Sequence, residues 1–584
     1  MRRVVFVAVA FLIAAPAVAA IVALAGRPWS PTFDLAIIDL RVRDVFTTRS
    51  SLTGLYSRPG WNHPGPLLFW GIAPLSWLSG HAPWATRVGG AILELIALVW
   101  LTIATGRWRL RLLLAAGIVT SSTYLASNQW LFREPWNLHI PVPYFLVFLF
   151  VTFLTAMGRF GQLIAMSIAG TVLVQTHVGY APLVAGGFVY AAVWILADVR
   201  RDGHMPDRWR STVVIAGAVW GVTWTAPIAE VIDHWPGNLG AIGRYFVDGE
   251  RPTVGFGRAL QFMAAEFRLV PPWLAGENRL VPFSAFAVPA PVAWLFVPLL
   301  LAGIAALALK RSRSQDGIRM LGLGLTLLVV GTVAISSADQ PLAYTFQWRV
   351  PVSVFFVVAC LWSIGTVFPD RHRLRVTAIV VAMGVVAWGS VAMTEAVMRH
   401  PNGLSTDREP DLARMMRTVD RSPPHGTLRL RWVAPSSPGL FDGVVNELDR
   451  RGIDVRVDPK LGRIFGPSRV LSLVHAAPTW YVTEVGSQIS QLLAMPGAHL
   501  VAATTPLRPG ADHELGALQA RIGAQLDRNG TPDLRAALDS GLAGIRLAHL
   551  PGIDSRDLRR LAELNANVER SGRCRCAMVA VPSA

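Results

Sequence analysis

Three aspartates, Asp34, Asp39 and Asp44, follow the first apolar run of this chain in the segment FDLAIIDLRVRDVF. A carboxylate beside a hydroxyl accepts its proton while the oxygen attacks an electrophile. On a helix, Asp39 and Arg43 would form an i,i+4 ion pair, so a surface helix with local ion pairs is the alternative interpretation. Ionisable groups near a bilayer are costly unless they serve a purpose, which favours catalysis. The residues alone leave these carboxylates open as candidates for a general base.

A second polar cluster lies in LFREPWNLHIP and contains Arg133, Glu134, Asn137 and His139. Glu134 supplies a carboxylate from a different segment, which could support the base or help to hold a divalent cation. Capping or an interfacial role is the alternative interpretation for these residues.

A third cluster combines His177 and Tyr180 in the turn HVGYAP with Arg349 in FQWRVP. A guanidinium binds a phosphate through two parallel hydrogen bonds, so Arg349 is a candidate anion-binding residue. An interfacial anchor beside Tyr344 and Trp348 is the alternative.

Two further segments carry polar or aromatic side chains. Asn62 and His63 stand in NHPGP, and the predicted loop 233–290 holds Trp235, Arg268 and Trp273. Aromatic faces suit sugar rings, so this loop is a candidate cover for a carbohydrate site.

Composition identifies the elements that must position these residues. The chain has 584 residues, 52% hydrophobic and 16% charged, whereas soluble domains average about 25% charged. The net charge of +17 comes mainly from Arg in short loops between apolar runs. That pattern indicates membrane topology and excludes nucleic acid as the expected partner.

Apolar runs predict about eleven transmembrane helices, with basic loops inside and the polar clusters outside. The segment 66–78 is too short to cross and contains Pro74, so we expect it to lie on the membrane surface. The N-terminus is expected in the cytoplasm and the C-terminus outside. The expected spans are 4–25, 84–105, 110–130, 142–157, 163–176, 183–197, 212–232, 291–309, 320–338, 351–368 and 376–396.

The composition changes near residue 399, which predicts a transmembrane domain over 1–398, with outer loops 27–83 and 233–290, and an extracytoplasmic α/β domain over 399–584. TLRLRWVA, IDVRV, TWYVTEV and CAMVAVP read as strands, and LFDGVVNELDRR and ADHELGALQARIGAQLDRNG as helices. No phosphate-binding loop or nucleophile motif occurs there, which indicates a structural or acceptor-guiding domain. Cys360 reads as a small core residue, and Cys574 and Cys576 as a bridge or two free thiols.

Carboxylates from two outer segments and a guanidinium suit glycosyl transfer. The carboxylate accepts the proton of the acceptor hydroxyl, and the cation stabilises the departing phosphate. The chain has no evident cytosolic catalytic domain and therefore no evident nucleotide-sugar site. Outside the cell, a sugar donor must be lipid-linked.

The layout resembles the GT-C glycosyltransferases, polytopic enzymes that use polyprenyl-phosphate sugars. FDLAIIDL with Asp34 stands where their first acidic motif lies, and NHPGPLLFW stands at their His-Pro-Pro-Leu-like motif. WATRVGG with Arg87, LFREPW with Glu134 and QWRVP with Arg349 follow in the family order. Leu35 replaces the expected second acid, and Gly65 replaces the second proline. Members with an outer C-terminal domain include actinobacterial arabinofuranosyl- and mannosyltransferases of the cell envelope.

The resemblance implies an inverting plasma-membrane enzyme that takes a polyprenyl-phosphate sugar donor and a glycan or glycolipid acceptor. Asp34 would be the base, and because Leu35 stands at the second acid, Asp39 is the alternative. Arg349 with His177 or Tyr180 would hold the phosphate, and His63 would order the outer loop. Need for a divalent metal (Mg²⁺ or Mn²⁺) is open. A flippase for lipid-linked glycans would predict inverted repeats, and none is clear. A non-catalytic scaffold for envelope assembly is the third interpretation.

Overall fold

The computed structural model divides the chain into two compact units. The first comprises Met1–Arg27 and Ser51–Gly403, and the second Pro28–Ser50 and Leu404–Ala584. The residues that the structure describes are 2–127, 130–247, 252–275, 289–340, 342–368, 372–399, 409–433, 438–471, 477–483, 486–503, 511–528, 554, 556–558, 560–561 and 577–582. Cys574 and Cys576 lie outside them.

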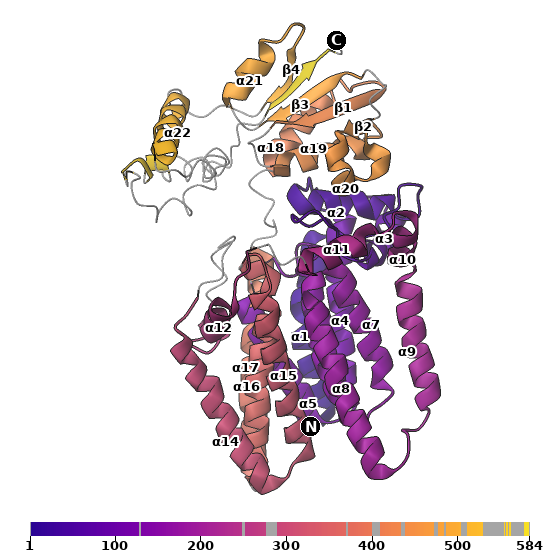
Figure 1. Cartoon of the computed structure of the whole chain (residues 1–584), viewed down its shortest axis with the longest axis vertical. Helices are drawn as coiled ribbons and strands as arrows, with labels where there is room; N and C mark the ends of the chain where they lie inside the picture. The colour runs from indigo at the N-terminus through magenta and orange to yellow at the C-terminus, as the bar shows by residue number, and fades with distance from the viewer. Residues whose placement is uncertain are drawn as a thin grey trace. The chain divides into compact units, whose positions relative to one another are not determined.

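The first unit is helical. α1 lies against α4 and α17, α6 against α7, and α15 against α16 (Figure 1). Its helices are α1 (Arg2–Leu24), α3 (Leu67–Leu78), α4 (Pro83–Gly106), α5 (Leu110–Ala126), α6 (Pro141–Ala156), α7 (Gln162–Thr176), η1 (Val178–Tyr180), α8 (Ala181–Asp202), α9 (Trp209–Thr223), α10 (Thr225–Asp233), α11 (Gly237–Val247), α12 (Phe256–Ala265), α13 (Pro272–Ala275), η3 (Val292–Leu295), α14 (Phe296–Ser312), α15 (Gln315–Ser336), η4 (Ala343–Phe346), α16 (Arg349–Gly365) and α17 (His372–Arg399).

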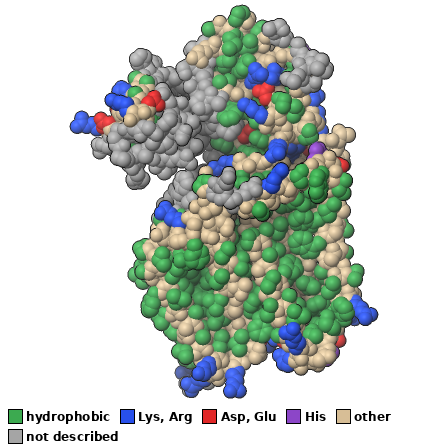
Figure 2. Space-filling view, viewed as in Figure 1, with side chains coloured by type: hydrophobic (Ala, Val, Ile, Leu, Met, Phe, Trp, Pro, Cys, Tyr) green, Lys and Arg blue, Asp and Glu red, His purple; other side chains and the backbone are tan. Residues whose placement is uncertain are grey.

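The chain is a multi-pass membrane protein. Among the described residues, seven helices are long and apolar enough to cross a bilayer, and α9 with α10 makes an eighth, bent by 47°. The other three expected spans are α5, α6 and α7, which are apolar and have 17, 16 and 15 residues. Hydrophobic side chains cover the flank of this unit in Figure 2, and Lys and Arg side chains gather at its lower end.

Helix α3 has 12 residues and contains Pro74. At about 1.5 Å per residue it is too short to cross the hydrocarbon core. Its length agrees with the surface helix that the sequence predicts.

Small residues let the membrane helices approach closely. Ser121 of α5 donates a hydrogen bond of 3.0 Å from Oγ to the carbonyl of Val386 in α17. A Cβ on Gly389 would overlap the Ser121 carbonyl. Glycine and serine at one crossing are typical of membrane helix packing. Cys360 is buried in α16 with a free thiol, as expected.

The second unit contains a five-stranded sheet of order β2-β1-β3-β5-β4, with β1 parallel to β2 and β3, and β5 antiparallel to β3 and β4. The predicted α/β class is confirmed, although the sequence did not predict β4. The elements are α2 (Phe33–Asp44), α18 (Glu409–Val419), β1 (Thr427–Trp432), α19 (Pro438–Arg450), β2 (Asp454–Val457), η6 (Pro459–Leu461), α20 (Gly462–Phe465), η7 (Pro467–Arg469), β3 (Thr479–Thr483), α21 (Gly486–Leu493), β4 (His499–Ala503), α22 (Ala511–Arg528) and β5 (Ala577–Val581).

Helix α2 groups with the C-terminal domain, although the sequence placed it in an outer loop of the membrane domain. It packs on α19 and α20. Apolar side chains are buried on it, among them Leu35, Ile38 and Leu40. The physical reason for the difference is a set of ion pairs that link α2 to residues far along the chain.

Candidate active site

Asp39 lies in one of these ion-pair sets. Its Oδ2 accepts a hydrogen bond of 3.0 Å from the Asn446 side chain and another from Arg450, both on α19. The predicted i,i+4 partner Arg43 stands 3.7 Å away. Asp39 is only 1% exposed. A buried carboxylate held by two guanidinium groups and an amide has a structural role that its sequence context did not reveal.

Asp44 is held in the same way. Its two oxygens accept hydrogen bonds of 2.7 Å each from the two terminal nitrogens of Arg469. Arg469 also donates to Asp449 at 2.9 and 3.0 Å, and Asp449 accepts from Arg43 at 2.9 Å. This network of alternating Asp and Arg side chains holds α2 against the rest of the second unit.

Asp34 lies apart from these pairs along α2. It is in the first turn of the helix, where the backbone dipole favours a negative charge, and it is half-buried. Asp34 stays our candidate for the base, as a proposal. It belongs to the second unit, whereas the other candidate residues belong to the first.

In the first unit, the FREPWNLH segment is buried between helices. Arg133 donates from Nε to the carbonyl of Val397 at 3.1 Å, and Arg87 donates to the Arg133 carbonyl at 3.1 Å. Burial, and then the charge of Arg87, lowers the pKa of Arg133 to about 10, while Glu134 acts in the opposite direction. Arg133 therefore anchors the loop to the end of α17, and Glu134, which is 2% exposed, is placed beside it.

His139 and Trp136 continue this segment. Their rings meet edge to face with centroids 5.2 Å apart, and Trp136 lies 5.5 Å from the Tyr344 ring. Arg58 donates a hydrogen bond of 2.9 Å to the Tyr344 hydroxyl. Burial lowers the pKa of His139 to about 3, against the opposing effect of a hydrogen bond to the Glu134 backbone. His139 is therefore neutral at pH 7.

The structure brings His63 and His177 together from two segments, with ring centroids 4.7 Å apart. Each Nδ1 accepts a backbone N–H at 3.2 Å, His63 from Val178 and His177 from Gly179. Burial lowers the pKa of both rings, that of His177 to about 4. The charge of His177 also contributes to the shift at His63.

This geometry fixes the tautomer. A neutral imidazole whose Nδ1 accepts a hydrogen bond carries its proton on Nε2. In the described part of the chain, no residue accepts a hydrogen bond from either Nε2. His63 and His177 therefore form a pair of neutral N–H donors.

Gly65 explains the departure from the His-Pro-Pro pattern. A Cβ at this position would overlap the Gln175 side chain and lie 2.5 Å from its Cδ. Gln175 is itself held by a hydrogen bond of 2.8 Å to the Thr223 carbonyl. A proline would meet the same obstacle, so the glycine allows the loop to approach α7.

Asn62 holds the other side of this loop. Its backbone N–H donates to the side chain of Asn238 at 2.7 Å, and Asn238 donates back to the Asn62 carbonyl at 2.8 Å. Glu230 accepts from the Asn238 backbone at 2.8 Å. Asn62 thus positions the His63 loop through α11.

Arg349 is the first residue of α16 and is 9% exposed. Its Nε donates to the buried carboxylate of Glu266, an interaction that the sequence did not predict. The indole N–H of Trp273 donates to the Glu266 carbonyl at 2.9 Å. One terminal nitrogen of Arg349 has no hydrogen-bond partner among the described residues. Glu266 therefore orients the guanidinium and leaves one of its donors for a ligand.

Several of these groups are neighbours. Asn137 donates to the Thr176 carbonyl at 3.5 Å, next to His177. A Cβ on Gly179 would lie 3.7 Å from the Thr345 carbonyl, next to Tyr344. Tyr180 is buried against Phe145 and contacts His177 at 6.1 Å between ring centroids. The His63–His177 pair, the FREPWNLH segment and the segment before Arg349 therefore adjoin one another.

The described residues contain no group of three His, Cys, Asp or Glu side chains arranged to hold a metal ion. Mg²⁺ is usually held by one or two carboxylates together with substrate phosphates, so this finding concerns only a site built entirely from protein side chains.

No protein-family model and no curated protein matches this chain. A crystal structure of ArnT from Cupriavidus metallidurans bound to undecaprenyl phosphate matches with a TM-score of 0.53 and 15% identity, over 85% of this chain and 96% of that one. The chain has the GT-C fold. The oligosaccharyltransferase AglB from Archaeoglobus fulgidus, in complex with an inhibitory peptide and a dolichol-phosphate, matches less closely, with a TM-score of 0.38 and 10% identity over 82% of this chain. The GT-C fold confirms the predicted fold class.

Proposed function

We propose that this protein is a glycosyltransferase that moves a sugar from a polyprenyl phosphate to an acceptor on the outer face of the membrane. The observation that carries the proposal is a cluster of buried polar side chains in the loops of a chain with the GT-C fold. Such groups cost free energy near a bilayer unless they bind something. The ArnT structure with this fold is bound to undecaprenyl phosphate, and a lipid-linked donor is proposed here on that likeness.

The donor phosphate is proposed to meet three hydrogen-bond donors. Arg349 offers its terminal nitrogen as a charged donor, and Glu266 fixes the plane of its guanidinium. His63 and His177 offer neutral Nε2–H groups. Oriented donors in a water-poor site stabilise the charge that develops on a departing phosphate. Trp273 and Tyr180 support this region by holding Glu266 and His177.

The proposed reaction is a single inverting displacement. The acceptor hydroxyl gives its proton to Asp34 while its oxygen forms a bond to the anomeric carbon. The bond from that carbon to the phosphate oxygen breaks, and its electron pair leaves with the polyprenyl phosphate. No second carboxylate is assigned as a nucleophile, which supports inversion over retention. Glu134 is proposed to orient the acceptor, with Arg133 and His139 shaping the segment that holds it.

The finer proposal is a role in building a cell-envelope glycan or glycolipid. The C-terminal α/β domain resembles the outer domains of arabinofuranosyl- and mannosyltransferases of actinobacteria in its position along the chain. The proposed orientation has the N-terminus in the cytoplasm, because the basic loops lie on that side by the charge rule.

The test uses the purified full-length protein in proteoliposomes with radiolabelled polyprenyl-phosphate arabinose, mannose and other single sugars, and envelope glycan acceptors. Transfer from at least one donor is expected, and Asp34→Asn should abolish it. Exposed Asp207→Asn serves as the charge-matched control. If the wild-type protein transfers no sugar from any donor but moves labelled lipid between leaflets, the flippase alternative replaces the proposal.

A further inference from the structure

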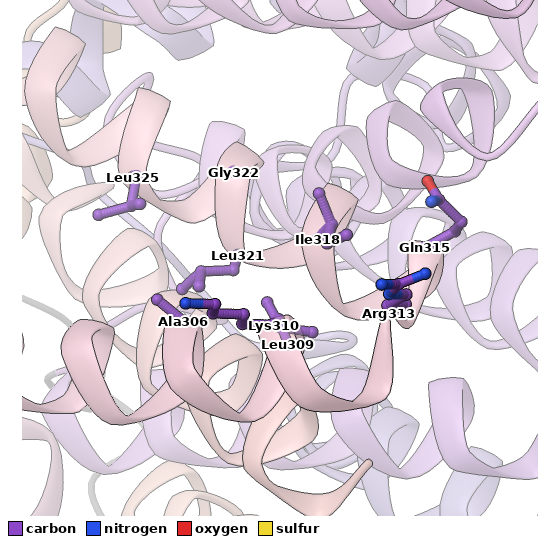
Figure 3. Close-up of a pocket in the computed structure, with 9 residues that line it drawn as sticks. All are labelled: Ala306, Leu309, Lys310, Arg313, Gln315, Ile318, Leu321, Gly322 and Leu325. Atoms are coloured by element: carbon purple, nitrogen blue, oxygen red, sulfur yellow. The ribbon is translucent and has the colours of Figure 1, made fainter. Parts of the chain in front are cut away.

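A groove lies between α14 and α15 at the short connection that joins them. It has a volume of about 580 Å³. Its apolar wall consists of Leu309 on α14 and Ile318, Leu321 and Leu325 on α15. Figure 3 shows Arg313 and Gln315 at one end of the groove and Leu325 at the other, with Lys310 beside Leu309. The groove is thus apolar along its length and basic at one end.

The basic end has an excess of positive charge. Lys310, Arg311 and Arg313 are exposed, and within the described residues none of them forms an ion pair. The two nearby acids are already neutralised, Asp316 by Arg109 and Asp198 by Arg319. An anion at this end would therefore meet cations without displacing an existing pair.

Arg313 has an unusual backbone conformation for a residue with a side chain. Its φ of 53° is in the left-handed region, where glycine is favoured at the end of a helix. An arginine there is retained at a conformational cost. Topology needs only positive charge somewhere in the loop, which Lys310 and Arg311 already supply. Arg313 holds this conformation although it is not glycine, and its side chain lines the groove.

The groove is separate from the candidate active site. It lies at the Gln315 end of α15, whereas the opposite end, Ser336, accepts a hydrogen bond from Gly255 at the start of α12, the helix that leads to Glu266. A helix of 22 residues spans roughly 33 Å. In Figure 1 the α14–α15 connection is at the lower end of the helices and α12 at the upper end.

We infer that this groove binds an anionic diacyl phospholipid, with its headgroup phosphate at Lys310 and Arg313 and one acyl chain along Leu309, Leu321 and Leu325. Basic pockets between membrane helices on the cytoplasmic side are suited to anionic headgroups. The charge distribution predicts this end on that side. The inference does not depend on the proposed glycosyl transfer.

The test uses the full-length protein in nanodiscs of phosphatidylcholine that contain a small fraction of a phospholipid with a photoactivatable acyl chain. The probe is either phosphatidylglycerol or phosphatidylcholine, and mass spectrometry maps the labelled peptides. Phosphatidylglycerol should label residues 306–325 about ten- to thirtyfold more than the choline lipid, given two basic side chains at the surface. Lys310→Gln with Arg313→Gln should remove this preference.

Two matched variants make the result decisive. Arg208→Gln with Arg210→Gln removes the same charge from another basic loop, and Arg208 also has a left-handed φ of 57°; this variant should keep the preference. Arg313→Gly should melt at a higher temperature than wild type in phosphatidylcholine yet bind less phosphatidylglycerol, which separates lost binding from lost folding. Equal labelling by both probes, or equal loss in the Arg208 control, would overturn the inference.

Discussion

Asp44 and Arg469 form a two-pronged ion pair, with both hydrogen bonds 2.7 Å long, across 425 residues of sequence. Together with the Asp39–Arg450 pair, it shows that two of the three acids after α1 have a structural role. Asp39 and Asp44 are therefore expected to matter for the stability of the second unit, whereas Asp34 is the proposed base.

The first prediction contrasts Asp34→Asn with Asp44→Asn. Asp34→Asn should reduce transfer at least about 100-fold with little change in folding, because a general base is lost. Asp44→Asn should leave Arg469 as an uncompensated buried charge and destabilise the second unit by about 3–5 kcal/mol. Thermal unfolding and the rate per folded molecule measure both effects. Asp34→Asn with full activity, or Asp44→Asn with normal stability, contradicts this assignment.

The second prediction concerns Arg349. Arg349→Lys should raise the KM for the lipid donor at least about tenfold, since a lysine cannot hold Glu266 and a phosphate in the same planar geometry. Glu266→Ala should have the same effect without touching the donor, because it releases the guanidinium. Initial rates against donor concentration measure it. The control is Arg258→Lys on α12, an exposed residue stacked on Phe262, which should keep the wild-type KM.

The third prediction concerns pH. His139 and His177 have lowered pKa values of about 3 and 4, so the unfolded chain binds more protons than the folded one below about pH 6.5. Their contribution to stability is therefore complete above pH 6.5 and is lost as the pH falls toward 4. For each pH unit in this range, each ring should lower the free energy of unfolding by about 1.4 kcal/mol.

Melting temperatures between pH 7.5 and 4.5 check this effect. His177→Gln should depend less steeply on pH than wild type, whereas His204→Gln in an exposed loop should follow the wild-type curve. A transfer rate whose pH dependence follows the titration of a single histidine near pH 6.5 would contradict a neutral His63–His177 pair.

The fourth prediction tests the His63 loop. Gly65→Ala should lower both stability and transfer, because the new methyl group overlaps Gln175. Gln175→Ala should remove that obstacle, so the double variant should recover part of what Gly65→Ala loses. A double-mutant cycle measures the coupling. Additive losses would mean that the two side chains do not compete for the same space.

The sequence predicted the elements better than their partners. Helix α3 was predicted as a surface helix from its length and Pro74, and the strands of the C-terminal domain from their apolar alternation; both signals are local. The Asp39–Arg43 pair was also local and is confirmed at 3.7 Å. Arg450 and Arg469 could not be recognised as partners of α2, because nothing in FDLAIIDL indicates which distant arginines will neutralise it.

The candidate site shows the same division. His63 and His177 were each predicted, and their contact came only from the structure. Glu266 was missed because it lies in a loop with no motif, and only a buried arginine in need of a counter-charge could have suggested it. The roles of Asp34, Glu134 and Arg349 in catalysis stay predictions.

The long-range pairs of α2 also affect biosynthesis. Ribosomes add roughly 5–20 residues per second, so roughly 20 to 85 s pass between the synthesis of Asp44 and that of Arg469. Until then Asp39 and Asp44 have Arg43 and Arg41 of the same helix as partners, each at 3.7 Å. A nascent chain that stops early can insert its membrane helices but lacks Arg450 and Arg469, which hold α2 on the C-terminal domain. Stable packing of α2 therefore has to wait until the last third of the same chain has been synthesised.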